Sequence, residues 1–113
     1  MEARCQVRYI RISPSKVGIV ADLVRGKPVR EALAILRYTP KKASKVVEKA
    51  IRSAIANAEN NHEMNGDLLY VSEIYVGQGP TLRRYRPRAR GIAYPIQKKT
   101  SHLTVILKER EEG

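Results

Sequence analysis

Apolar and polar residues alternate over the first ten positions of the chain, and this pattern is typical of a half-buried β-strand. Ala3, Cys5, Val7 and Tyr9 fall on one face, and Arg4, Gln6 and Arg8 fall on the other. We therefore predict a strand over residues 3–9 with Cys5 on its buried face. At that position we expect the cysteine to serve as a small buried hydrophobe rather than as a reactive thiol.

The apolar spacing changes to that of a helix after Ser13-Pro14, a pair that offers a capping oxygen followed by proline at the first helical position. The spacing predicts a helix over 14–25, closed by Gly26, with Val17, Val20, Ala21 and Val24 on its buried face. A short second helix is predicted from Val29, Ala32, Leu33 and Leu36. Thr39-Pro40 repeats the capping signal, so a third helix is expected to begin there.

The third helix has the clearest pattern in the chain and should be the central core helix. Its apolar stripe runs unbroken through Ala43, Val46, Val47, Ala50, Ile51, Ala54, Ile55 and Ala58. The opposite face carries Lys41, Lys42, Lys45, Lys49 and Arg52. Such faces are usually solvated, and contact with phosphate is the less favoured alternative.

The second half of the chain predicts a sheet. Residues 60–66 are polar and turn-rich, so they are expected to form a loop with His62 at the surface. Two β-rich runs follow at 68–76 and 103–107, and they are suited to pair as antiparallel strands. With 113 residues and no internal repeat, we expect residues 1–113 to form a single domain.

A long basic excursion separates these two strands. Between Glu73 and Glu109 there is no acidic residue, whereas Arg83, Arg84, Arg86, Arg88, Arg90, Lys98, Lys99 and Lys108 are all cationic. If the flanking strands continue outward and turn near 88–91, they form a hairpin arm over about 78–101 that reaches roughly 30 Å. Pro95 lacks an N–H and should interrupt or bulge the returning strand.

The composition of the arm favours an ordered complex with RNA. RNA supplies phosphates for the arginine forks, and it supplies unstacked bases for Tyr85, Tyr94 and the guanidinium planes. The alternative is a disordered basic tail that binds any polyanion. Another alternative is a DNA-binding or architectural regulator that places the arm in a groove. A membrane-surface binder is disfavoured, because charged and apolar residues are interleaved along the arm without helical segregation.

The overall charge also favours nucleic acid as a partner. Twenty-two Lys and Arg against eleven Asp and Glu give a net charge of +11. No apolar run approaches the ~20 residues of a spanning helix, and the first residues lack a signal-peptide segment, so we expect an intracellular, soluble protein. One cysteine and two distant histidines predict no disulfide, metal or cofactor. No catalytic residues are indicated, because no nucleophile, acid pair or phosphate loop is evident, and we do not expect an enzyme.

Four stretches of the chain resemble one known family in order and spacing. They are YIRISPSKVGIVADLVRGK at 9–27, ALAILRYTPKKAS at 32–44, SAIANAENNH at 53–62, and RPRARG with KKTSHLTVIL at 86–91 and 98–107. These stretches resemble bacterial large-ribosomal-subunit protein twenty-two. The resemblance implies an α+β fold, with three helices packed on a three-stranded antiparallel sheet and a long protruding basic β-hairpin.

The resemblance also implies a role and a set of partners. The role is that of a structural constituent of the large subunit, which binds large-subunit ribosomal RNA and supports subunit assembly in the cytoplasm. The implied partners are neighbouring ribosomal proteins, including protein four near the tunnel constriction, and the nascent polypeptide. Neither a membrane nor a second copy of the chain is expected as a partner.

The residues expected to carry this role fall in two groups. The expected ribosomal RNA-binding residues are Arg11, Ser13, Lys16, Arg25, Lys27, Arg83, Arg84, Arg86, Arg88, Arg90, Lys98, Lys99, Thr100, Ser101 and His102. The hairpin tip implied to line the nascent-peptide tunnel is Arg86, Pro87, Arg88, Ala89, Arg90, Gly91 and Ile92.

Overall fold

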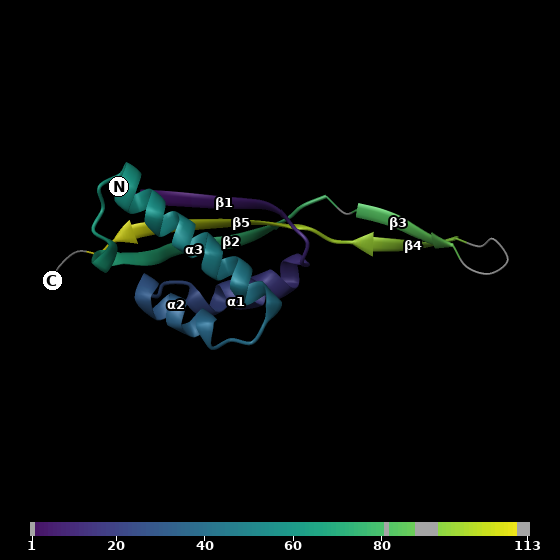
Figure 1. Ribbon diagram of the computed structural model, residues 1–113, viewed down its shortest axis with the longest axis horizontal. Coiled ribbons are helices and arrows are strands. Elements are labelled where there is room, and N and C mark those ends of the chain that lie inside the picture. The colour runs from purple at the N-terminus through teal and green to yellow at the C-terminus, as the bar shows by residue number, and fades with distance from the viewer. Residues whose placement is uncertain (1, 81, 88–92, 111–113) are drawn as a thin grey trace.

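The chain forms a body of helices on a sheet from which a two-stranded arm projects (Figure 1). This computed structural model describes residues 2–80, 82–87 and 93–110, with side chains at 2–80 and 99–110. The elements in chain order are β1 (Glu2–Ile10), α1 (Pro14–Val24), α2 (Val29–Arg37), α3 (Lys42–Asn61), the 3-10 helix η1 (Gly66–Leu68), β2 (Leu69–Gln78), β3 (Leu82–Pro87), β4 (Ala93–Lys98) and β5 (Ser101–Glu109).

The body is an α+β layer structure, as predicted. Its antiparallel sheet has three strands in the order β1-β5-β2, so the last strand of the chain lies in the middle. Helix α3 packs against β1 and β5, and α1 packs against β2. The two predicted runs 68–76 and 103–107 are paired as expected, with Ile74 opposite Val105.

The core lies between the helices and one face of the sheet. The stripe on α3 is confirmed: Ala43, Val47, Ala50, Ile51, Ala54 and Ala58 are buried, and Val46 and Ile55 pack partly buried against them. Four of the buried α3 residues are alanines, which allow the helix to approach the sheet closely. Cys5 packs half-buried against this core, and burial raises the pKa of its thiol above the ordinary value.

The predicted helix starts are confirmed in one case and wrong in the other. Helix α1 begins at Pro14 as expected, but the Ser13 side chain makes no capping hydrogen bond. Thr39-Pro40 does not start α3, which begins at Lys42. The Thr39 hydroxyl instead donates to the Ile35 carbonyl at 2.7 Å, so it satisfies the end of α2.

Tyr9 is a second correction, because the strand alternation breaks there. Its φ is 59°, and the register of β1 against β5 shifts between Val7 and Ile10. The side chain is 61% exposed rather than buried, and its ring packs edge-on against His102 with centroids 5.1 Å apart. The irregularity turns β1 toward the loop that leads into α1.

Both edges of the sheet are protected by other segments. On the β2 side, the link after α1 pairs with the strand: Gly26 N donates to Val71 O, and Val71 N donates to Lys27 O, each at 2.9 Å. Gly26 adopts φ 79°, the left-handed conformation predicted for it. On the β1 side, Asn57 of α3 donates to Arg4 O at 3.1 Å.

The arm continues outward from β2 and β5 and leaves the body at the end opposite both termini (Figure 1). The molecule is therefore elongated, with extents of 69 × 27 × 17 Å. Strands β3 and β4 pair from Leu82 with Lys98 to Pro87 with Ala93, and the register passes Tyr85 and Pro95 without a shift. The bulge predicted at Pro95 is therefore wrong. The turn predicted at 88–91 lies outside the described residues.

Candidate nucleic-acid interface

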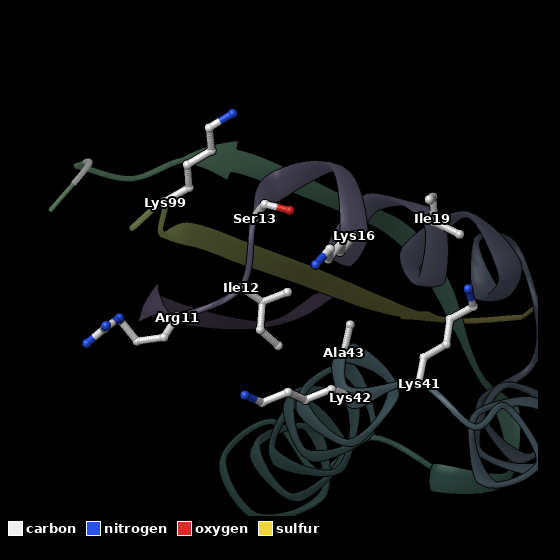
Figure 2. Close-up of a pocket in the computed structure, with 9 residues that line it drawn as sticks. All are labelled: Arg11, Ile12, Ser13, Lys16, Ile19, Lys41, Lys42, Ala43 and Lys99. Atoms are coloured by element: carbon white, nitrogen blue, oxygen red, sulfur yellow. The ribbon is translucent and has the colours of Figure 1, made fainter. Parts of the chain in front are cut away.

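A basic cleft of about 790 Å³ opens where the starts of α1 and α3 meet the loop after β1 and the base of the arm. Figure 2 shows Ser13 and Lys16 on one side of it, and Lys42 and Ala43 on the other. Its lining is Arg11, Ile12, Ser13, Lys16, Ile19, Lys41, Lys42, Ala43 and Lys99. Five of these nine residues are cationic and none is acidic.

Segments far apart in the sequence build this cleft because short polar contacts tie them together. The Ser101 hydroxyl at the start of β5 donates to the Ile12 carbonyl, which fixes the loop after β1 against the central strand. Just before this loop, near the end of β1, Tyr9 N donates to His102 Nδ1 of β5 at 3.1 Å. The Thr39 bond to α2 sets the turn from which Lys41 and Lys42 project.

The acidic residues of the body lie elsewhere. Within the part of the chain that the structure describes, the four ion pairs join Asp22 to Arg25, Glu31 to Lys27, Asp67 to Arg30 and Glu48 to Arg52. All involve side chains outside the cleft lining, so none of its five cations takes part in a described ion pair, and Glu48 lines an adjoining pocket together with Lys41 and Lys42. The cleft therefore concentrates positive potential, and a polyanion would relieve the repulsion among these charges.

Four residues that the sequence singled out are brought together here: Arg11, Ser13, Lys16 and Lys99. Lys41 and Lys42 complete the charge, and sequence reasoning had placed them on a face that was more readily explained as solvated. The signal in the sequence was the pair of lysines directly after Thr39-Pro40. It was ambiguous because the position of that turn relative to α1 depends on tertiary packing.

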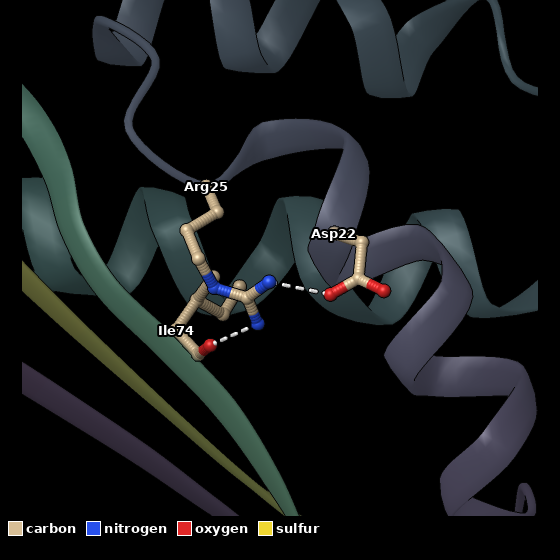
Figure 3. A network of polar contacts seen from close by, with 3 residues as sticks. All are labelled: Asp22, Arg25 and Ile74. Carbon is tan, nitrogen blue, oxygen red and sulfur yellow. Dashed lines mark hydrogen bonds and ion pairs between the residues drawn. The ribbon is translucent and has the colours of Figure 1, made fainter.

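Arg25 and Lys27 lie in a different place, at the edge of the sheet beside β2. Figure 3 shows the Arg25 guanidinium between the Asp22 carboxylate and the Ile74 carbonyl. Its Nη2 donates to Ile74 O at 2.7 Å, while Nη1 pairs with Asp22. Lys27 faces Glu31 at 4.0 Å. Two donors of Arg25 are thus already used inside the chain, one to tie the end of α1 to β2 and the other to pair with Asp22 of α1 itself.

Thr100, Ser101 and His102 stand at the joint between arm and body. Thr100 is 2% exposed and Ser101 is fully buried. The Thr100 hydroxyl donates to Pro80 O at 2.6 Å, and Gly79 N donates to Thr100 O at 3.0 Å. In this structure the two hydroxyls are used inside the chain, so they position the joint rather than face a partner.

The remaining predicted residues belong to the arm. Arg83, Arg84 and Arg86 lie in β3, opposite Gln97, Ile96 and Tyr94 of β4, and Lys98 ends β4. Of the predicted tip, Arg86 and Pro87 lie at the end of β3. Arg88, Ala89, Arg90, Gly91 and Ile92 lie outside the described residues.

The described residues form neither a membrane-spanning helix nor a cluster of metal ligands. No helix among them has the length and apolarity to cross a membrane. No group of three or more His, Cys, Asp or Glu side chains among them is arranged to hold a metal ion.

The fold and the cleft together define the class of protein. It is a small, strongly basic α+β protein with a cation-lined cleft at the base of a basic arm. A family model described as ribosomal protein L22p/L17e matches residues 5–108. The large ribosomal subunit protein uL22 of Carboxydothermus hydrogenoformans is 62% identical over 113 residues, which is the full length of both chains. That of Clostridium beijerinckii is 60% identical over 110 residues, covering 97% of this chain and 99% of the relative.

The chain therefore belongs to the L22p/L17e family of ribosomal proteins. It is a protein of the large ribosomal subunit in the cytoplasm, and it is not an enzyme. The family expected from the sequence is confirmed.

Proposed function

We propose that this chain binds large-subunit ribosomal RNA through the basic cleft and the arm, and that this binding supports assembly of the subunit. The observation that carries the proposal is the cleft itself, in which five cations from four segments converge without a described carboxylate. RNA phosphates supply the missing negative charge, and arginine and lysine contacts to phosphate provide most of such affinity. Because the family belongs to the large ribosomal subunit, ribosomal RNA is the polyanion that this chain meets there.

The arm has a second role in this proposal, as part of the wall of the nascent-peptide exit tunnel. The arm projects along the longest axis of the molecule, which measures 69 Å, whereas the other two axes measure 27 Å and 17 Å. In the proposal, the tip of the arm at residues 86–92 lies next to the extension of protein four and to the nascent polypeptide, as the family resemblance implies. The arm residues Arg83, Arg84, Arg86, Arg88, Arg90 and Lys98 would contact RNA along its length.

A salt titration tests the RNA-binding part. If arm and cleft together neutralise about six to ten phosphates, affinity for large-subunit ribosomal RNA should fall by about three to five orders of magnitude between 50 and 200 mM salt. Duplex DNA at matched salt is the control and should bind more weakly. A nearly flat salt dependence, or equal binding to DNA, would contradict the proposal.

Cross-linking from assembled ribosomes tests the tunnel part. In a Cys5→Ala background, a photoreactive group is attached at Ala89→Cys, and a control carries it at Tyr38→Cys on the body, where the native side chain is 81% exposed. A nascent chain short enough to lie inside the tunnel should cross-link to the first variant only. Equal labelling of both variants would contradict a tunnel position for the arm.

A further inference from the structure

The basic cleft has an apolar floor as well as a cationic rim. Ile12 is half-buried, Ala43 is 4% exposed, and Ile19 leaves 54% of its surface open to the cleft and to solvent. A surface that only grips phosphate needs no such floor. Figure 2 shows Ile12 and Ala43 between the side chains of Lys16 and Lys42.

Ser13 provides an unused polar group at the same place. It stands at the N-terminal cap position of α1 but makes no capping hydrogen bond, and its hydroxyl lies 3.4 Å from that of Ser15, beyond ordinary hydrogen-bond length for two hydroxyls. The side chain lines the cleft beside Ile12. It can therefore donate to, or accept from, a group that enters the cleft.

We propose that this cleft receives one unstacked nucleotide of RNA, with the base against Ile12 and Ile19 and the flanking phosphates on the lysine rim. The proposal rests on the proposed function and specifies which feature of the RNA the body recognises. Splayed-out bases of loops and bulges are contacted by apolar or planar side chains and by polar groups at their edges. Arg11 offers a guanidinium plane and Ser13 offers the polar group.

A regular RNA duplex fits the cleft less well. Its bases are paired and their faces are stacked inside, so a protein surface meets phosphates, 2′-hydroxyls and the base edges of the shallow minor groove but no open base face. The rim would then be neutralised, but the floor of Ile12 and Ile19 would gain no apolar contact. Only an unpaired nucleotide uses the floor, the hydroxyl and the rim together.

The test compares two RNA probes with the full-length chain. One is a hairpin with a perfect stem of about 20 base pairs, and the other has the same stem with a single bulged nucleotide at its centre. Binding is measured across a salt series for each probe, because the arm contributes to both. The expected result is a preference of about fivefold for the bulged stem, the low end for base stacking on a side chain because this floor is aliphatic.

Two matched pairs of variants assign that preference to the cleft. Ile19→Ala removes the exposed part of the floor, and Leu23→Ala, one turn further along α1 and 41% exposed, is its control outside the cleft. Ile19→Ala should abolish most of the preference for the bulged stem and leave the salt slope unchanged. Leu23→Ala should retain both.

The second pair tests the rim. Lys41→Ala with Lys42→Ala should lower the salt slope on the bulged stem by about 1.4 to 1.8, since each lost phosphate contact removes about 0.7 to 0.9. Lys45→Ala with Lys49→Ala removes the same charge from α3 outside the cleft and should lower the slope less. All these positions are exposed, so circular dichroism should show an unchanged fold.

Several outcomes would overturn the inference. Equal affinity for the two stems, equal effects of Ile19→Ala and Leu23→Ala, or equal effects of the two lysine pairs would each mean that the cleft does not hold an unstacked nucleotide. If binding to ribosomal RNA nevertheless remains steeply dependent on salt, only this inference fails. If the salt dependence is flat for every RNA, the proposed function fails with it.

Discussion

Replacing the arm by a tight turn should separate the stability of the body from RNA binding. Gly79 N donates to Thr100 O at 3.0 Å and Thr100 Oγ1 donates to Pro80 O at 2.6 Å, so the two ends of the arm lie side by side. Residues 81–98 can therefore be removed and Pro80 joined to Lys99 through Asn-Gly, a pair that favours the turn of a two-residue hairpin.

The structure predicts that this shortened chain folds. All residues of the described hydrophobic core lie outside 81–98, and both hydrogen bonds at the joint are kept. Replacing eighteen residues by two lowers the entropy cost of closing the loop, which contributes up to about 2 kcal/mol in favour of folding. The free energy of unfolding in urea should therefore stay within about 1 kcal/mol of the parent or rise.

RNA binding should change much more than stability. The deleted segment carries Arg83, Arg84, Arg86, Arg88, Arg90 and Lys98. If each of these six contacts one phosphate, the slope of log affinity against log salt should fall by about 4 to 5. The cleft should keep residual affinity, because its lining lies outside the deletion.

A milder variant serves as the control for this deletion. Glutamine at Arg83, Arg84 and Arg86 keeps the arm and should lower the slope by about 2 to 3. An unfolded deletion protein would mean that the arm packs on the body, against the argument from the core. A slope equal to that of the parent would mean that the arm does not contact RNA.

Four single substitutions in the body make further predictions, all measured by urea unfolding. Gly26→Ala should cost about 1–2 kcal/mol because φ is 79°, and parent-like stability would contradict the left-handed backbone. Gly18→Ala should add up to about 1 kcal/mol, since no atom lies within 4 Å of the new Cβ in α1; a loss would mean a hidden clash. Ser44→Ala should add about 1 kcal/mol by removing a buried hydroxyl without a partner, and a loss would reveal one. Ser13→Ala should lower the free energy of unfolding by only about 0.3 kcal/mol, because the side chain makes no capping hydrogen bond. A loss of the ~1 kcal/mol that a capping side chain contributes would show that the cap forms.

The elements that the sequence predicts well are those whose signal is local. The α3 stripe from Ala43 to Ala58 and the start of α1 at Pro14 were both correct, because side-chain spacing and proline geometry act within a few residues. Gly26 was correct for the same reason. Each of these features is fixed by the backbone near it, whatever the rest of the fold does.

The errors occurred where a competing hydrogen bond, from a distant strand in one case and from the preceding helix in the other, decides the local structure. Tyr9 continues the apolar alternation in the sequence, but the chain leaves the sheet there. The Tyr9 backbone N–H donates to the His102 side chain of β5. The Thr39 hydroxyl donates to the Ile35 carbonyl at the end of α2, so it does not cap α3. In both cases a competing hydrogen-bond partner, which periodicity cannot reveal, determined the outcome.

The sequence predicts one half of the candidate site more readily than the other. Charge along the arm is contiguous in the sequence, so composition alone predicts that the arm binds a polyanion. The cleft is assembled from Arg11, Lys16, Lys41, Lys42 and Lys99, which lie up to 88 positions apart between first and last. Lys41 and Lys42 could be recognised as part of a site only once the start of α3 was placed beside the start of α1.

The placement of acidic residues explains how one small chain can be both stable and strongly basic. The four ion pairs lie on the helices and at η1, where charges of both signs are close together and the repulsion within the body is reduced. Lys99 lines the cleft and stands between β4 and β5, so the cleft opens beside the base of the arm. In the proposed complex, RNA in the cleft would lie at the base of the arm, and this arrangement favours one order of events in assembly. We expect the preorganised cleft to engage first and the arm to dock along RNA already in place, because the cleft is built on the packed core whereas the arm pairs only with itself.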